Sequence, residues 1–170
     1  WDESKKIKFQ GGWLWNISPR STTRWYSVEQ SMGLYPAGVN EKGQKSNYGG
    51  NIKSNGIIMA NVSANPHANI KLNVWDMMIT NVMNTAMGEI NTSFGDQYNF
   101  YQGLMFIHQN AINDGGNADP TKTYLLKGAQ SNVISAQFGL KYARINTSIN
   151  YTHITGDGRY LSPREWGKDP

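Results

Sequence analysis

Residues 132–154, NVISAQFGLKYARINTSINYTHI, alternate apolar and polar side chains on both sides of a short turn at 143–144. Alternation with a period of two places successive side chains on opposite faces of a β-strand, so the stretch predicts two strands paired in a hairpin. The residues expected on its apolar face are Ile134, Ala136, Phe138, Leu140, Tyr142, Ile145, Thr147, Ile149 and Tyr151. Whether this face contacts a protein core or lipid decides the function.

The composition favours an all-β protein. The chain has 170 residues, including six Trp, nine Tyr and five Phe, and only 16% of its residues are charged. It contains no cysteine, which excludes disulfides and thiolate chemistry. The net charge of +4 is mild and the sequence has no run of Lys or Arg, so nucleic acid is not an expected partner.

Membrane helices are not expected, because the sequence has no stretch of about 18 apolar residues. A barrel strand crosses a bilayer with only about 9–11 residues, of which every second one is apolar. Its polar half keeps the mean hydropathy low. The negative mean hydropathy of −0.58 is therefore neutral on the question of a membrane.

The pattern along the chain predicts about seven strands, which we interpret as part of a single β-barrel domain that includes 1–170. Residues 1–56 are irregular and loop-rich, with a strand at 6–15 that Gly11 and Gly12 interrupt and a short helix at 27–35 capped by Ser27 and Gln30. Strands and loops follow over 57–160, and a further loop starts at 161–170. The expected strands of the middle part are 56–64, 69–79, 82–94, 97–109 and the two strands of the hairpin.

Loop lengths give a second signal. Short turns are expected at 65–68, 80–81 and 143–144, and long polar loops at 36–56 and 110–121. Short turns on one rim and long loops on the other are typical of outer-membrane barrels. We also expect a bulge or a change of face near Trp75–Met78, where the alternation weakens.

The hairpin leaves two interpretations open. Its second face carries Ser, Gln, Gly, Asn and Thr with a single lysine, which suits the lumen of a barrel, and Tyr142 and Tyr151 lie where interfacial aromatic girdles are found. The alternative is a soluble β-sandwich that binds a carbohydrate or another ligand through its aromatic side chains. A sandwich folds in water, whereas the apolar face of a barrel requires detergent or lipid.

With the strands placed, the sequence resembles the OprD-type family of bacterial outer-membrane porins. The resemblance lies in ANIKLNVWDMMITNVMNT, GLMFIHQNAINDGGNA and AQSNVISAQFGLKYARINTSINYTHITGDGRY. SPRSTTRWYSVEQSMGLYP and YLSPREWGKDP are similar to a version of the family found in Bacteroidota-like bacteria. The resemblance implies a Gram-negative outer-membrane channel of about eighteen strands, which passes small and often carboxylate-bearing solutes. It also implies inward-folded loops and a ladder of basic side chains along the lumen. Seven strands are too few for such a barrel, so we expect the remainder of the same barrel to complete the wall. The other expected partners are lipid and small polar solutes.

Two arginines are candidates for selecting solutes from a loop. Arg20 and Arg24 flank Ser-Thr-Thr, and an arginine fork matches a carboxylate with two parallel hydrogen bonds. They select anions or zwitterions if their loop folds into the lumen. The alternative is a solvated loop in which they pair with Glu29 or a neighbouring carbonyl.

Three further basic residues are candidates for lining the pore. Lys71 and Lys141 lie on the polar faces of their predicted strands. Arg164 and Glu165 form either a constriction pair or a simple loop ion pair.

Catalysis has no support in the sequence. His67, His108 and His153 lie far apart and lack metal-ligand spacing. No nucleophile elbow, P-loop or dinucleotide-binding motif is present. We therefore expect a protein that is not an enzyme and has neither a metal nor a cofactor.

Overall fold

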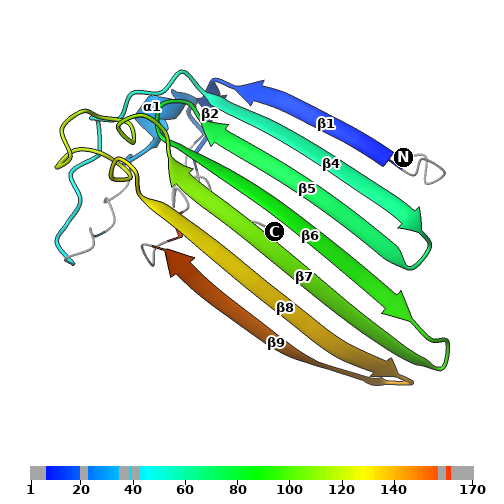
Figure 1. Ribbon diagram of the computed structural model, residues 1–170. Coiled ribbons are helices and arrows are strands. Elements are labelled where there is room, and N and C mark those ends of the chain that lie inside the picture. The colour runs from blue at the N-terminus through cyan, green and yellow to red at the C-terminus, as the bar shows by residue number, and fades with distance from the viewer. Residues whose placement is uncertain (1–6, 20–22, 35–38, 40–42, 157–159, 162–170) are drawn as a thin grey trace.

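The computed structural model describes residues 7–19, 23–34, 39, 43–156 and 160–161. Seven antiparallel strands form one sheet in the order β1-β4-β5-β6-β7-β8-β9 (Figure 1). The strands are β1 (Ile7–Leu14), β4 (Ile57–His67), β5 (Ile70–Ile79), β6 (Met83–Phe94), β7 (Tyr98–Ala111), β8 (Gln130–Tyr142) and β9 (Ile145–Gly156). Strands that follow one another in the chain are neighbours from β4 to β9, so the sheet is a meander.

A small sheet and a single helical turn lie between β1 and β4. β2 (Asn16–Ile17) pairs with β3 (Tyr26–Ser27), and α1 (Val28–Ser31) follows directly. Ser27 and Gln30 cap this turn reciprocally, because each side chain bonds the backbone N–H of the other. The expected helix start is therefore confirmed.

The connections separate onto two rims. The connections at 68–69, 95–97 and 143–144 are short and join strands at one rim. The connections at 15–56 and 112–129 lie at the opposite rim, where the loops and α1 gather in Figure 1. The short turn at 80–82 also lies on this second rim, because it joins β5 to β6. The expected grouping of this turn with the short-turn rim is wrong.

Three local predictions are wrong for identifiable reasons. β4 continues through Asn65 and Pro66 to His67, and the register shifts between Ala64 and His67 absorb the proline, so the turn is at 68–69. β5 keeps an unbroken register through Trp75–Met78, where we expected a bulge. β1 is also continuous across its two glycines, because β4 pairs with it over its whole length.

One face of the sheet is apolar from edge to edge. Directly paired residues of antiparallel strands lie on the same face, so the register extends the apolar face of the hairpin to the other strands. It includes Phe9, Val62, Leu72, Val74, Ile90, Leu104 and Phe106 besides the hairpin residues. Phe138 is 52% exposed and Ile149 is 78% exposed. The described residues contain no second large sheet that covers this face, which argues against the sandwich.

The hydrophobic core lies on the opposite face, at the rim of the long loops. Ile57, Ile79 and Met83 are direct neighbours in the register and point to this side of the sheet. Loop and helix residues pack on them and leave all three almost completely buried. The cluster consists of Val28, Met32, Tyr48, Ile52, Ile57, Ile79, Val82, Met83 and Leu125. We call this side of the sheet the loop-covered face.

Candidate solute-facing wall

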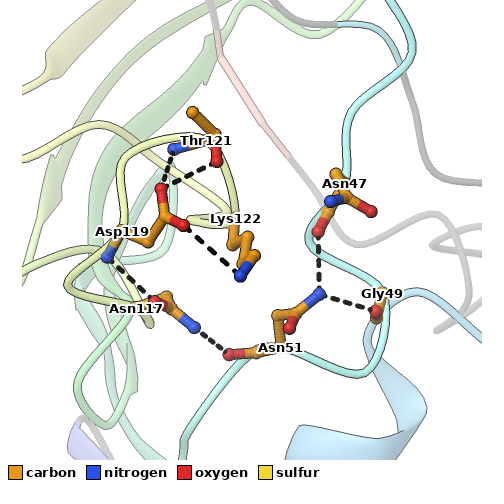
Figure 2. Close-up of polar contacts among 7 residues, drawn as sticks. All are labelled: Asn47, Gly49, Asn51, Asn117, Asp119, Thr121 and Lys122. Carbon is orange, nitrogen blue, oxygen red and sulfur yellow. Dashed lines mark hydrogen bonds and ion pairs between the residues drawn. The ribbon is translucent and has the colours of Figure 1, made fainter.

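Two long loops are joined where they meet over the loop-covered face. The Asn117 side-chain amide donates to the backbone carbonyl of Asn51 at 2.6 Å, and the Asn51 amide donates to the carbonyls of Asn47 and Gly49 (Figure 2). The backbone N–H of Lys53 donates to the carbonyl of Gly116 at 2.9 Å. Because backbone groups of both loops are satisfied in this way, the loops form one packed unit.

A tight turn around Asp119 completes this unit. The carboxylate accepts hydrogen bonds from the Thr121 hydroxyl at 2.7 Å and from its backbone N–H at 3.0 Å (Figure 2). These two bonds, the hydroxyl first, lower the pKa of the Asp119 carboxyl below its ordinary value of 3.8, and Lys122 at 3.4 Å adds to the effect. The charge of Lys122 is thereby partly compensated within the loop.

Beneath the loops, the loop-covered face changes from apolar to polar along the strands. Trp75, Met87, Ile107 and Val133 are neighbours in one row across β5 to β8. Ile107 and Val133 are buried and the other two are half-buried. This apolar row lies on the short-turn side of the core cluster on which the loops pack. Sequence reasoning missed it, because methionines on an otherwise polar face weaken the alternation from which faces are read.

Polar side chains occupy the half of this face that lies toward the short turns. The Asn61 amide donates to Asn73 Oδ1 at 2.6 Å, and the Ser63 hydroxyl bonds the side chains of both asparagines. On the next strand, β6, the Asn91 amide donates to Glu89 Oε1 at 3.3 Å. These residues form an amide-rich surface that carries one carboxylate, that of Glu89.

Lys71 and Lys141 lie on this polar half, as expected. Lys71 pairs in register with Asn91, and Lys141 pairs with Asn99 and Asn146, and both lysines are exposed. They belong to β5 and β8, three strand spacings apart, which is about 14 Å across the sheet. The structure therefore places both cations on one face without bringing them together.

The structure describes only one of the three arginine candidates. Arg24 is exposed in the segment before β3, at the rim of the long loops. Arg20 and Arg164 lie outside the described residues. The role of all three in solute selection remains a prediction.

An aromatic ring stiffens the polar half of the face. Tyr101 on β7 lies opposite Gly139 on β8, and a Cβ at Gly139 would overlap the tyrosine ring. The Tyr101 hydroxyl donates to Asn146 Oδ1 at 2.8 Å and so reaches β9. The ring therefore covers the glycine and joins three strands.

The described part of the chain holds no group of three or more His, Cys, Asp or Glu side chains able to bind a metal. His108 lies on the apolar face, where its Nδ1 bonds Asn132 Oδ1 at 2.8 Å. His67 and His153 belong to β4 and β9 and are not brought near it in the register. Within the same residues, no helix is both long enough and apolar enough to cross a bilayer.

Comparisons with solved structures identify the fold. The chain is similar to Pseudomonas aeruginosa OccK8 (OprE), with a TM-score of 0.69, 12% identity, and coverage of 93% of this chain and 40% of that one. It is similar to Acinetobacter baumannii OccAB2, with a TM-score of 0.65, 16% identity, and coverage of 92% and 35%. For Pseudomonas aeruginosa OccK9 (OpdG) the TM-score is 0.64 with 8% identity, and coverage is 91% and 34%. No protein-family model and no curated protein sequence matches the chain.

These three structures are outer-membrane porins of the Occ/OprD family, and the chain spans 34–40% of their lengths. The resemblance drawn from the sequence is thus confirmed at the level of the fold. The antiparallel seven-stranded sheet matches part of the barrel of these porins.

Proposed function

We propose that this chain is part of the wall of an outer-membrane channel through which small polar solutes diffuse. The observation that carries the proposal is the height of the apolar face. On β7 the residues of this face from Tyr98 to Phe106 are apolar except Gln102, and they span about 27 Å along an antiparallel strand. At a tilt of about 40° this becomes about 21 Å along the membrane normal, close to the apolar band of about 25 Å in outer-membrane barrels.

The ends of this band carry the residues expected at membrane interfaces. Toward the short turns, Tyr98 and Tyr142 stack with ring centroids 4.4 Å apart, and Phe94 and Phe100 stack at 5.6 Å. Toward the long loops, hydrogen-bonded polar pairs follow on the same face, such as Asn84 with Asp76 at 2.9 Å. An aromatic border on one side and a polar border on the other support a bilayer as the contact of this face.

The loop-covered face then lines the lumen. Its packed loops narrow the passage at the rim where they meet, and its amide-rich half presents hydrogen-bonding groups to hydrated solutes. Lys71 and Lys141 add positive potential, which favours carboxylate-bearing solutes over cations. Transport by diffusion requires no catalytic group, cofactor or metal.

The remaining wall comes from further strands of the same barrel. β1 and β9 are the outermost strands of the described sheet, and closure of a barrel pairs such edges. Lipid, small polar solutes and those further strands are the partners that the proposal requires.

Ion selectivity in planar bilayers tests the proposal. The barrel that contains this chain is reconstituted, and the reversal potential is measured across a salt gradient for the native protein and the double variant Lys71→Gln/Lys141→Gln. We expect native channels to prefer anions more than the variant does. Arg144→Gln in the short turn is the matched control, since it removes one cation away from the wall, and we expect it to leave selectivity unchanged. A protein that forms no channels, or a double variant that behaves as the native protein does, contradicts the proposal.

A further inference from the structure

A single glutamine connects the loop-covered wall to the chain that follows β9. Gln109 Nε2 on β7 donates to the backbone carbonyl of Leu161 at 2.8 Å, and the backbone N–H of Leu161 donates to Gln109 Oε1 at 2.9 Å. The side-chain amide therefore bonds one residue through both of its backbone groups, as a neighbouring strand would.

Every hydrogen-bonding group of the Gln109 side chain has a partner. Its side chain is 1% exposed, and Nε2 also donates to the Thr85 hydroxyl on β6 at 3.0 Å. Both amide hydrogens and the carbonyl oxygen thus have partners. A buried amide that loses a partner is strongly disfavoured, so this geometry holds only while Leu161 stays in place.

Leu161 is attached by its side chain as well. It packs against the hydrophobic cluster beneath the loops, 52 residues along the chain from Gln109. β7 and β9 are separated by β8, so Leu161, five residues after the end of β9, is bonded to a strand that is not the neighbour of β9. Leu161 lies on the loop-covered face, which lines the lumen in the proposed channel, so its distance from the wall affects the cross-section left for solutes.

We propose that Gln109 is a positioning residue that holds Leu161 against the lumen wall and thereby sets the width of the passage. The effect on the width of the passage rests on the proposed channel function. The attachment of Leu161 to Gln109 does not depend on that function. Gln109 contacts no solute in this account. It acts only through Leu161, and Thr85 orients its amide.

The variant Gln109→Leu removes both hydrogen bonds to Leu161 and the one to Thr85, and keeps a side chain of similar size. Gln109→Glu keeps the acceptor but places a carboxylate oxygen where Nε2 faced the Leu161 carbonyl, so it also opposes the attachment. Gln102→Leu is the matched control, because Gln102 lies on the same strand but on the apolar face and is exposed. Folding of each variant in the complete barrel is checked first by heat-modifiable migration on gels.

Two measurements then follow. Spin labels at cysteines introduced at Tyr160, next to Leu161, and at Gln137 report the distance between Leu161 and β8, and the native chain has no cysteine to interfere. We expect one narrow distance distribution in the native background and in Gln102→Leu, and a broad one in both Gln109 variants. Single-channel conductance should fall about twofold in the Gln109 variants, because Leu161 released from the wall enters the cross-section of the passage.

Each outcome decides a separate statement. Unchanged narrow distances in folded Gln109 variants overturn the attachment. Broadened distances with unchanged conductance overturn the control of pore width. If the native barrel conducts no ions at all, the proposed function fails, and the distance measurement still decides whether Gln109 holds Leu161.

Discussion

The contact between Tyr101 and Gly139 gives a prediction whose size can be worked from the structure. In Gly139→Ala, the new Cβ would lie 2.5 Å from the Tyr101 hydroxyl oxygen and closer still to the ring, whereas ordinary contacts begin near 3.4 Å. The ring must therefore move by about 1 Å or more, which breaks the bond from its hydroxyl to Asn146.

The energy terms have opposite signs. The lost hydrogen bond costs about 1 kcal/mol and the lost cover of the glycine by the ring costs about 0.5–1 kcal/mol. Replacing glycine by alanine within a strand raises the free energy of unfolding by about 0.5–1 kcal/mol. We therefore expect Gly139→Ala to lower the free energy of unfolding by about 1 kcal/mol.

Gly88 provides the matched control. It lies on β6, and nothing is found within 4 Å of an added Cβ. Gly88→Ala keeps only the favourable term, so we expect a gain of about 0.5–1 kcal/mol. The assay is urea unfolding of the complete barrel in lipid vesicles, followed by tryptophan fluorescence. Equal stabilities of Gly139→Ala and Gly88→Ala would refute the argument that the tyrosine ring requires a glycine beneath it.

Three further predictions follow from other parts of the structure. Met83→Ala should lower the free energy of unfolding by about 2–5 kcal/mol, because Met83 is fully buried beneath the loops, and a change below 1 kcal/mol in the same assay would contradict this packing. Ile149→Lys should cost about 2–4 kcal/mol in vesicles if its face contacts lipid, while Asn150→Lys, one residue later on the other face, should stay within about 0.5 kcal/mol of native. The pKa of Asp119 is lowered in the folded loop, so its contribution to stability is present above pH 3.8 and is lost as the pH falls through the folded pKa. A nuclear magnetic resonance titration should show the Asp119 pKa rising toward 3.8 in Thr121→Val, and an unchanged value would remove the hydroxyl as the main cause.

The sheet could be predicted from the sequence wherever alternation was strict. The hairpin of β8 and β9 was predicted with its turn at 143–144, because its two strands alternate without interruption and nothing but two residues separates them. The Ser27 and Gln30 caps were predictable for a similar reason, since a capping box is a local contact. Features that depend on neighbours within four residues are visible in a single sequence.

The errors come from contacts between distant residues. Pro66 signalled a turn, yet the shifted register of β4 against β5 accommodates it as a bulge. Trp75 suggested a change of face, whereas it belongs to an apolar row with Met87, Ile107 and Val133 that no local pattern reveals. The bonds of Gln109 to a residue 52 positions later carry no signal in the local pattern. The joined asparagines of the two loops are equally invisible before the loops are folded together.

The most direct test of the account is the environment of single nitroxide labels along β8 in the complete barrel. Labels are attached at introduced cysteines at 134, 136, 138 and 140, and then at 135, 137 and 141. The accessibility of each label to oxygen and to a water-soluble relaxation agent is measured in lipid vesicles. The account predicts that the even positions report lipid and the odd positions report water or packed protein, with Lys141 among the solvated ones. Even positions that are shielded from lipid, in a protein that folds without detergent, would contradict the channel.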